Sequence, residues 1–513
     1  MNNQQEPMNL KRRHNNLFCL LISFLLIATP LLSNDNINRT LGKAQAAEDL
    51  RLYFKLIDEQ HGNPYQYVSR SAFFNAIEET IIQLPESIDI KSFELELSKL
   101  NNLIRCGHTT VNLPTEVFKY ESNLDQFFPI PVSIIDGEIY VDFDQTKIPH
   151  GSKIISINNI ELKHSIRDLT QLTVTDGLGD TKPLGDLESR FGYYFYLQFG
   201  GFKNFNVKYQ SPEGALNELS IAGVAGHKMM ANHYFRPLYQ SHERYYHFTH
   251  LDAIDSLHTM VLTLNTFQAN PDWFYQRISS RYDEEAKVFD FSHLVLDLRQ
   301  NEGGDRRILN FLYEFLTGKE LVDPSQSSTR TLSIKSPELL EGINGSLSSR
   351  GLILQAERYL AEHFVLQSEE GYKAEEQNWH ETFDAGIHWA GEAFEGQIYV
   401  LTSGKTFSAA ADFTRILGAM DNVSIVGEET GGANVGRTAN MLLNYSLPNT
   451  GTMVQIPVIY EEFVNTNKIE NAGRGTFPDY YVKQSYTDLL GQKDAPFDFA
   501  LGLIQNNLQQ GSN

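Results

Sequence analysis

Cysteine is scarce in this chain, which has only two such residues, Cys19 and Cys106, among 513. Cys19 lies in an apolar segment near the N-terminus, so removal of that segment would leave a single thiol and no possible intrachain disulfide. A large exported protein without disulfides is typical of the bacterial envelope, where the size of the core rather than cross-linking stabilises the fold.

Positive charge is also in deficit, because 42 lysines and arginines face 64 acidic residues and give a formal net charge of −22. Such a chain offers no basic surface for phosphate groups, so we expect no nucleic-acid partner. Hydrophobic residues make up 41% and charged residues 21%, as in a soluble globular protein rather than a disordered one. The length predicts two or three domains.

Several motifs that would indicate a bound cofactor are missing. The sequence contains no H-E-x-x-H, paired C-x-x-C or EF-hand pattern, so we expect no metal. It also lacks the G-x-x-x-x-G-K and G-x-G-x-x-G patterns of phosphate-binding loops, and we expect no other cofactor. The G-x-S-x-G elbow of lipases and esterases is absent, since Ala410 stands where its second glycine would be.

Only one long apolar run is present, at residues 17–33, and it follows three basic residues at 11–13. This order predicts a secretory signal, and we assign residues 1–46 to a signal peptide or N-terminal anchor. The segment 44–46, Ala-Gln-Ala, is a candidate cleavage site, with cleavage near Ser33 or retention as an anchor as alternatives. We therefore expect export to the periplasm, cell envelope or exterior of a bacterium, with membrane attachment only through this segment.

The rest of the chain changes character three times. Residues 47–115 have apolar residues at three- and four-residue spacing, which predicts a helical N-terminal domain. Residues 116–225 contain short alternating strands and hairpin turns, which predicts a β-rich module. Residues 226–505 alternate buried strands with helical patterns, which indicates an α/β architecture. Within this last part, the polar stretch 325–395 is predicted to be a helical insertion or lid.

Two stretches of the α/β part carry chemistry-bearing residues. In GKTFSAAADF, residues 404–413, Ser408 stands where a buried strand leads into a helix, so its hydroxyl is either a nucleophile or a helix N-cap. At that place free N–H groups and the helix dipole favour developing negative charge. In DLRQNEGG, residues 297–304, Gly303 and Gly304 leave backbone N–H groups unshielded; the alternative is a simple turn.

Taken together, DLRQNEGG, TFSAAADF, VGEETGG and RGTFPDYYV closely resemble the tricorn and C-terminal-processing (tail-specific) serine peptidase family. The resemblance spans roughly residues 48–505 and implies a crotonase-like (ClpP/crotonase) α/β peptidase core. HGSKIISINNIEL in the β-rich module resembles the PDZ-like module of the family.

The family activates its serine in one of two ways. One branch uses a lysine, but the corresponding position here holds Ala433, and Lys405 precedes the serine. The tricorn-type branch uses histidine and glutamate, and the resemblance implies that His108, in Cys-Gly-His-Thr, is the base. The same resemblance implies that Glu470, in Glu-Asn-Ala-Gly, orients that histidine.

Two further roles remain to be assigned. Glu461 and Glu462 are alternatives to Glu470 for the carboxylate. The resemblance assigns the oxyanion donors to the N–H of Ala409 and of Gly303 or Gly304. Cys106 is disfavoured as an alternative nucleophile, because a residue two positions from His108 rarely shares its face.

The sequence therefore predicts an exported serine endopeptidase that hydrolyses polypeptides through a Ser-His-Glu triad and an acyl-enzyme. Two alternatives stay open: a non-catalytic member that binds a ligand or peptide, and an esterase that uses the same triad. Cleavage preference and oligomeric state are not specified by any pattern in the sequence.

Overall fold

The described part of the chain begins near the end of the predicted export segment. The computed structural model describes residues 39–286, 291–322, 325–368, 371–374, 388–389, 391–464 and 472–511. The apolar run at 17–33, Cys19 and Glu470 lie outside these ranges. Thr40–Asn513 form one compact unit, distinct from Met1–Arg39. Within the described ranges, no helix has both the length and the apolar character needed to cross a membrane.

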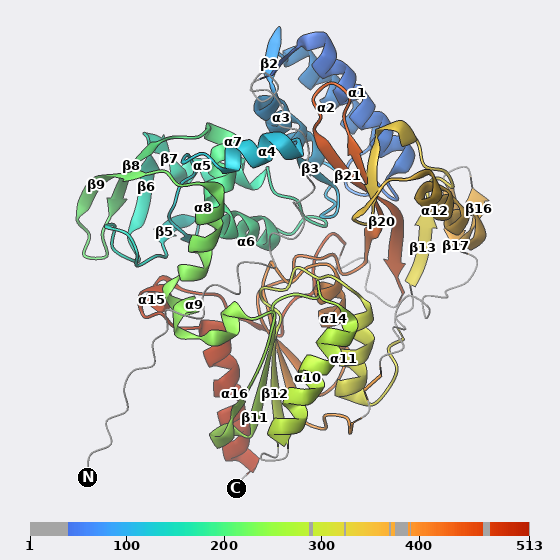
Figure 1. The fold of residues 1–513 in the computed structure, drawn as a ribbon. Coiled ribbons are helices and arrows are strands. Elements are labelled where there is room, and N and C mark those ends of the chain that lie inside the picture. Colours follow the sequence, from blue (N-terminus) through green and yellow to red (C-terminus); the bar gives the residue numbers. More distant parts are fainter. Residues whose placement is uncertain are drawn as a thin grey trace. The chain divides into compact units, whose positions relative to one another are not determined.

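A six-stranded sheet forms the centre of the α/β part (Figure 1). Its strands in spatial order are β10 (Thr249–Ile254), β11 (Thr259–Leu264), β12 (His293–Asp297), β18 (Gln397–Thr402), β19 (Val423–Gly427) and β22 (Tyr480–Tyr481). Only β10 runs antiparallel to its neighbour. The strands β11 and β12 are buried along their whole length, as expected for parallel strands covered on both faces.

Helices cover both faces of this sheet. Alternate strand residues such as Leu294 and Leu296 pack with α10 (Pro271–Ala286), α11 (Arg307–Thr317) and α14 (Ala409–Leu417). The residues between them, such as Val295, pack against α16 (Ala495–Gly511) on the other face. This three-layer arrangement confirms the predicted α/β fold class.

A second sheet has eight described strands and packs against the N-terminal helices. Its strands in order are β15 (Ser346–Leu347), β14 (Leu340–Ile343), β20 (Gly436–Ser446), β21 (Met453–Phe463), β13 (Ser325–Thr329), β17 (Gly371–Ala374) and β16 (Phe364–Ser368), with β3 (Thr110–Asn112) paired to β21. The helices on it are α1 (Lys43–Gln60), α2 (Arg70–Gln83), α3 (Ile90–Asn102) and α12 (Arg350–His363). Their shared core joins residues from both ends of the chain.

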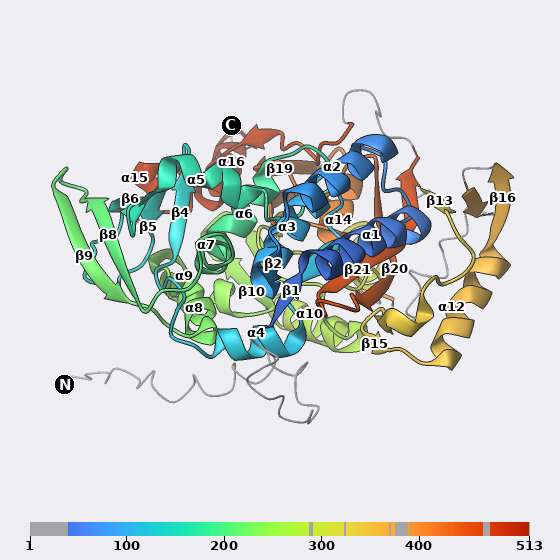
Figure 2. The same ribbon diagram turned by 90° about the horizontal axis from the view of Figure 1, so that it is seen from above.

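A third sheet lies within residues 116–225. Its strands are β4 (Val132–Ile135), β5 (Glu138–Val141), β6 (Lys153–Ile157), β8 (Asn204–Gln210) and β9 (Leu216–Ala222), with β7 (Ile160–Glu161) paired to β6. The helices around it are α4 (Thr115–Ser122), α5 (Leu162–Thr170), α6 (Thr181–Ser189), α7 (Phe191–Phe199), α8 (Gly226–Asn232) and α9 (Pro237–Ser241). Figure 2 shows β8 and β9 on the opposite side of α1–α3 from α12. The remaining described strands and helix are β1 (Thr40–Gly42), β2 (Ser87–Asp89) and α15 (Tyr486–Leu490).

Two predicted segment boundaries need correction. The described residues of 325–395 contain one long helix, α12, and five strands, because their alternating burial suits extension of the second sheet rather than a helical lid. The predicted export segment ends too late, because residues 40–42 pair with β2 and Ala46 is fully buried in α1. Residues 40–46 are therefore part of the folded unit.

Candidate active site

Ser408 lies between the end of β18 and the start of α14, as the sequence predicts. Its backbone has φ 51° and ψ −126°, a left-handed conformation that a side chain disfavours. Such strain costs on the order of 1–3 kcal/mol and concentrates at functional sites. The next two residues, Ala409 and Ala410, are fully buried, so their small size lets α14 pack closely on the sheet.

His108 faces Ser408 across 300 positions of sequence, and its Nε2 lies 3.0 Å from the serine Oγ. The loop that carries His108 leads into β3, which pairs with β21. Gln455 of β21 donates a hydrogen bond to the His108 carbonyl oxygen (2.9 Å). The imidazole ring also stacks on Phe407, with 4.8 Å between ring centroids. The structure therefore brings together the nucleophile and the base that the sequence singled out.

A carboxylate that the sequence did not indicate faces the other side of the ring. Asp176 Oδ2 lies 3.9 Å from His108 Nδ1, a distance suited to an ion pair and too long for a hydrogen bond. The other oxygen, Oδ1, accepts the N–H of Gly107 (2.6 Å). Asp176 belongs to the loop between α5 and α6, whose sequence TDGLGD is that of an ordinary turn. No local pattern marks Asp176 as functional.

The C-terminal end of α3 holds both of these loops. Asn101 donates its side-chain amide to the carbonyl of Thr109 (2.7 Å), next to His108. Asn102 donates to the carbonyl of Thr173 (2.8 Å), three positions before Asp176. Two adjacent side chains thus fix the relative positions of the base and the carboxylate.

Burial controls the protonation of the site. Burial, assisted by the positive charges of Arg437 and Lys182, lowers the pKa of His108 to about 3, so the ring is neutral and able to accept a proton. Burial raises the pKa of Asp176 to about 6. Burial and the nearby Asp176 raise the pKa of the Cys106 thiol to about 12, so this thiol stays protonated and is a poor nucleophile at neutral pH.

Two glycines follow β12, and Gly303 packs against the serine while Gly304 packs against Phe267; their N–H groups also differ. Gly303 donates its N–H to Asn301 Oδ1 (2.9 Å), and this bond uses the single hydrogen-bond donor of Gly303. The N–H groups of Gly304 and Ala409 donate to no other residue in the described ranges. A Cβ on Gly303 would lie 2.7 Å from Ser408 Cβ, and the φ of 94° at Gly303 is also one that favours glycine. Of the two glycines predicted as donors, Gly304 is the one whose N–H is unoccupied.

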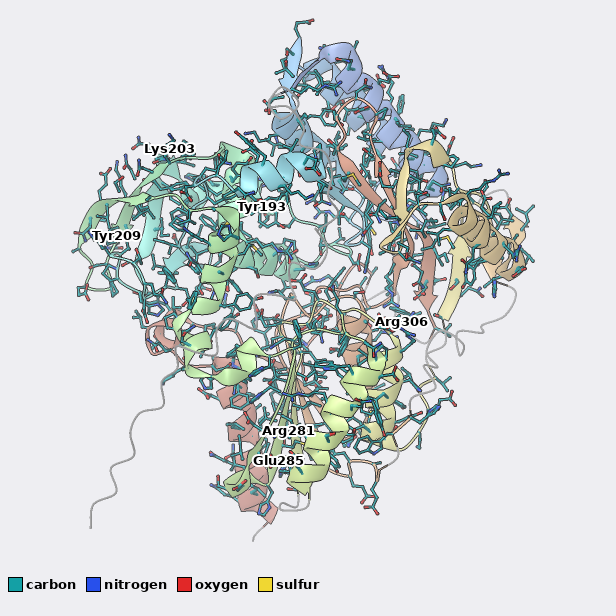
Figure 3. All side chains as sticks on the ribbon, viewed as in Figure 1. Tyr193, Lys203, Tyr209, Arg281, Glu285 and Arg306 are labelled. Carbon is teal, nitrogen blue, oxygen red and sulfur yellow. The ribbon has the colours of Figure 1, made fainter. Side chains whose placement is uncertain are left out.

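The structure describes two of the three carboxylates that the sequence predicted for this role, Glu461 and Glu462. Glu470 lies outside the described residues. Glu461 is completely buried and forms ion pairs with Arg306 (3.0 Å) and Arg437 (2.9 Å). Arg306, labelled in Figure 3, lies where α11 begins. Glu462 is the next residue of the same strand, so its side chain points to the opposite face.

The alternative lysine base is likewise placed elsewhere. Lys405 donates a hydrogen bond from Nζ to Gln300 Oε1 (2.8 Å) and lies 3.8 Å from Glu302. Ala433, at the position of the lysine in the other branch, is buried and offers no proton acceptor. Among the described residues, His108 is the base in contact with Ser408.

Residues 258–482 match Peptidase family S41. This part of the chain is an S41-family serine peptidase region. Similar folds are found in the structure of mature CPAF complexed with lactacystin (12% identity, TM-score 0.58, covering 91% of this chain and 98% of that chain) and in mature CPAF (13% identity, TM-score 0.56, 88% and 94%). At these identities the likeness shows the fold alone. No curated protein sequence matches the chain.

The matched part of this S41 peptidase holds Ser408, Gly303 and Gly304, but neither His108 nor Asp176. The predicted base His108 and the neighbouring carboxylate of Asp176 therefore come from the part of the chain before the matched region. The candidate site is assembled only when these parts of the compact unit pack together.

Proposed function

We propose that this peptidase cleaves internal peptide bonds of polypeptides through Ser408, with His108 as general base and acid. The observation that carries the proposal is the 3.0 Å approach of His108 Nε2 to Ser408 Oγ. His108 takes the hydroxyl proton as Oγ attacks the carbonyl carbon, and then gives this proton to the leaving amine. Water hydrolyses the resulting acyl-enzyme with the same histidine as base.

The tetrahedral intermediate requires donors for its oxyanion. We assign this role to the N–H groups of Ala409, which follows the serine, and of Gly304, which follows the glycine packed against it; neither has another acceptor in the described ranges. One such donor typically contributes about 10²–10³ in rate. The N–H of Gly303 acts indirectly, because its bond to Asn301 fixes the loop.

Two carboxylates are proposed for the opposite side of the imidazole. Asp176 is within 3.9 Å of Nδ1 and is suited to stabilise the imidazolium that forms during the reaction. Glu470 remains the prediction from sequence for the same role. Gly473, three positions after it, accepts the N–H of Leu178 (2.6 Å), two positions after Asp176. The segments that carry Asp176 and Glu470 are thus in contact, and separate substitutions of the two carboxylates distinguish the two proposals.

We also propose that the protein is exported to the bacterial envelope or beyond. The proposal is supported by the basic residues at 11–13 and the apolar run at 17–33. Because residues 40–46 belong to the fold, cleavage of the signal is proposed before Thr40, nearer the alternative site at Ser33.

Mutation of the pair tests the proposed mechanism. Ser408→Ala and His108→Ala are each expected to lower kcat by roughly 10⁴–10⁶, and the double variant to be little worse than either, because the two residues act as a unit. Turnover of an unstructured polypeptide and of a small ester would be measured side by side. The exposed residues Ser71 and His164 provide matched controls, Ser71→Ala and His164→Ala, that should retain wild-type turnover.

A fluorophosphonate probe gives an independent readout of the nucleophile. The probe should label the wild-type chain and Ser71→Ala but not Ser408→Ala. Labelling that persists in Ser408→Ala, or additive losses in the double variant, would contradict the proposal. Ester cleavage without polypeptide cleavage would favour the esterase alternative.

A further inference from the structure

Three side chains with metal-ligating atoms meet beside the Ser408–His108 pair. Cys106 Sγ, a ring nitrogen of His108 and a carboxylate oxygen of Asp176 lie within 4.8 Å of one another, and His108 Nδ1 is the nitrogen that faces Asp176. Two of the atoms in this cluster, His108 Nδ1 and Asp176 Oδ2, are buried and have no hydrogen-bond partner among the described residues. Buried polar atoms without partners are rare because each costs free energy. These two atoms are therefore available to bind a ligand.

We propose that Cys106, His108 and Asp176 together bind one thiophilic divalent cation, represented by Zn²⁺, and that the bound ion switches the peptidase off. The inference rests on the proposed function for its effect on activity, but not for binding. Sulfur, imidazole nitrogen and carboxylate oxygen are the donors that Zn²⁺ takes in proteins, whereas Mg²⁺ and Ca²⁺ prefer oxygen alone. The sequence analysis predicted no metal because only Cys106 and His108 are neighbours in sequence, while Asp176 comes from a separate segment, so the three form no linear metal-binding pattern.

The spacing of the cluster suits a small ion after a modest adjustment. Bond lengths of about 2.0–2.3 Å place the ligand atoms of tetrahedral Zn²⁺ roughly 3.3–3.6 Å apart. The 3.9 Å between His108 Nδ1 and Asp176 Oδ2 is already close to this value. The widest separation in the cluster is at most 4.8 Å, so a contraction of about 1 Å by side-chain rotation closes the site. The His108 side chain is 12% exposed, which gives an ion a route from the substrate side.

Inhibition follows from the tautomer that the ion imposes. The ion needs the Nδ1 lone pair of His108, so the single proton of the neutral ring must reside on Nε2. Nε2, 3.0 Å from Ser408 Oγ, then donates a hydrogen bond and cannot accept the serine proton. Cys106 loses its thiol proton to solvent on binding, while ionised Asp176 binds without proton exchange. One proton is released for each ion bound, and no base remains for Ser408.

Binding is tested without reference to activity, on the full-length Ser408→Ala protein titrated with Co²⁺ in excess Mg²⁺. We expect one ion per chain and a thiolate-to-cobalt charge-transfer absorption, both displaced by Zn²⁺. Cys106→Ala and Cys106→Ser should abolish the absorption and weaken binding at least about tenfold, the minimum cost of losing even a supporting residue at a metal site. Cys19→Ala, the matched control for the other thiol, should keep both the absorption and the binding affinity. Absence of the band in Ser408→Ala, or its persistence in Cys106→Ala, would overturn the inference.

Inhibition is tested on the active chain, with each variant normalised to its own activity without metal. Zn²⁺ should lower kcat with little change in KM, and a chelator should restore activity. Cys106→Ala should need at least about tenfold more Zn²⁺ for the same fractional loss. Equal sensitivity of Cys106→Ala and Cys19→Ala to Zn²⁺ would contradict the proposed inhibition by the bound ion. It would not contradict the proposed peptidase activity. Cobalt binding through Cys106 in a chain without peptidase activity would instead contradict the proposed function but support the cation site.

Discussion

The imidazole of His108 is held on several sides, and each contact affects the proposed proton transfer differently. Phe407 stacks on one face of the ring, and Lys182 Nζ lies 4.5 Å from the centre of the Phe407 ring. The positive charge of Lys182 helps to keep the imidazole neutral before reaction. Asp176 acts in the opposite direction, because its negative charge favours the imidazolium once the proton has moved. The balance between these charges sets the strength of the base.

Asp176→Asn tests this balance. The amide oxygen can still accept the Gly107 N–H, so the loop should hold, but the charge facing Nδ1 is lost. The imidazolium is then less stable, so kcat should fall by at least about tenfold, and by less than the roughly 10⁴ seen when a triad aspartate bonds directly to the ring. Loss of the negative charge lowers the pKa of His108, so the acid limb of kcat/KM should move to lower pH. In wild type this limb should lie below the ordinary histidine value of about 6.5.

The pH profile of kcat/KM, measured from about pH 2.5 to pH 9, reports both effects. Asp168→Asn, an exposed aspartate on α5, is the matched control and should leave the limb and the plateau unchanged. If Asp176→Asn behaves like this control while Glu470→Gln lowers the plateau and moves the limb, then Glu470 is the orienting carboxylate and Asp176 is not.

At the scale of elements, α3 supports the loop that carries the proposed base, His108. Asp89 caps its N-terminus by accepting the N–H groups of Lys91 and Ser92, each at 3.0 Å. The same helix carries Glu94, which is 1% exposed and whose Oε2 has no partner among the described residues. Burial raises the pKa of Glu94 to about 8, so the folded protein keeps a proton there at neutral pH.

Glu94→Gln should therefore change the pH dependence of stability. Between about pH 4.5 and 8 the unfolded wild type gives up this proton while the folded state keeps it, so the free energy of unfolding falls as pH rises. Glutamine has no such proton, so the free energy of unfolding of the variant relative to wild type should increase across this window by a few kcal/mol and then level off. Denaturant unfolding at several pH values measures this difference, with Glu96→Gln on the same helix as control. A difference that is constant with pH would show that Glu94 ionises normally.

At the scale of the whole molecule, Thr40–Asn513 form one compact unit whose first strand is part of the fold. β1 pairs residue by residue with β2, from Thr40 opposite Asp89 to Gly42 opposite Ser87. A protease that removed residues up to 46 would delete this strand and the first turn of α1. The location of any cleavage is thus constrained by packing as well as by signal-peptide pattern.

Export and processing are tested together by fractionating the bacterium and sequencing the mature N-terminus. We expect the protein in the periplasm, in the envelope or outside the cell, with a mature chain that starts before Thr40 or with an uncleaved anchor. An intact chain confined to the cytosol would contradict export. A mature N-terminus after residue 46 would contradict the inferred role of β1.

Local pattern was sufficient for several features of this protein. The α/β class follows from buried strands alternating with helical periodicity, because a strand covered on both faces must be apolar along its length. The position of Ser408 at a strand–helix junction follows from the apolar run before it and the small residues after it. These signals are local, so a single sequence carries them.

Other features were decided only by tertiary packing. The strands of 325–374 were mistaken for a helical insertion because their polar residues become buried only when the second sheet assembles. Asp176 lies opposite His108 through long-range contacts, among them the hydrogen bonds of Asn102 to Thr173 and of Gly107 to Asp176, which no linear motif encodes. Gly303 and Gly304 look equivalent in sequence, and the bond to Asn301 alone distinguishes their N–H groups. Sequence determined which residue types were available for catalysis, whereas long-range contacts decided which of them meet, because contact depends on the path of the chain between them.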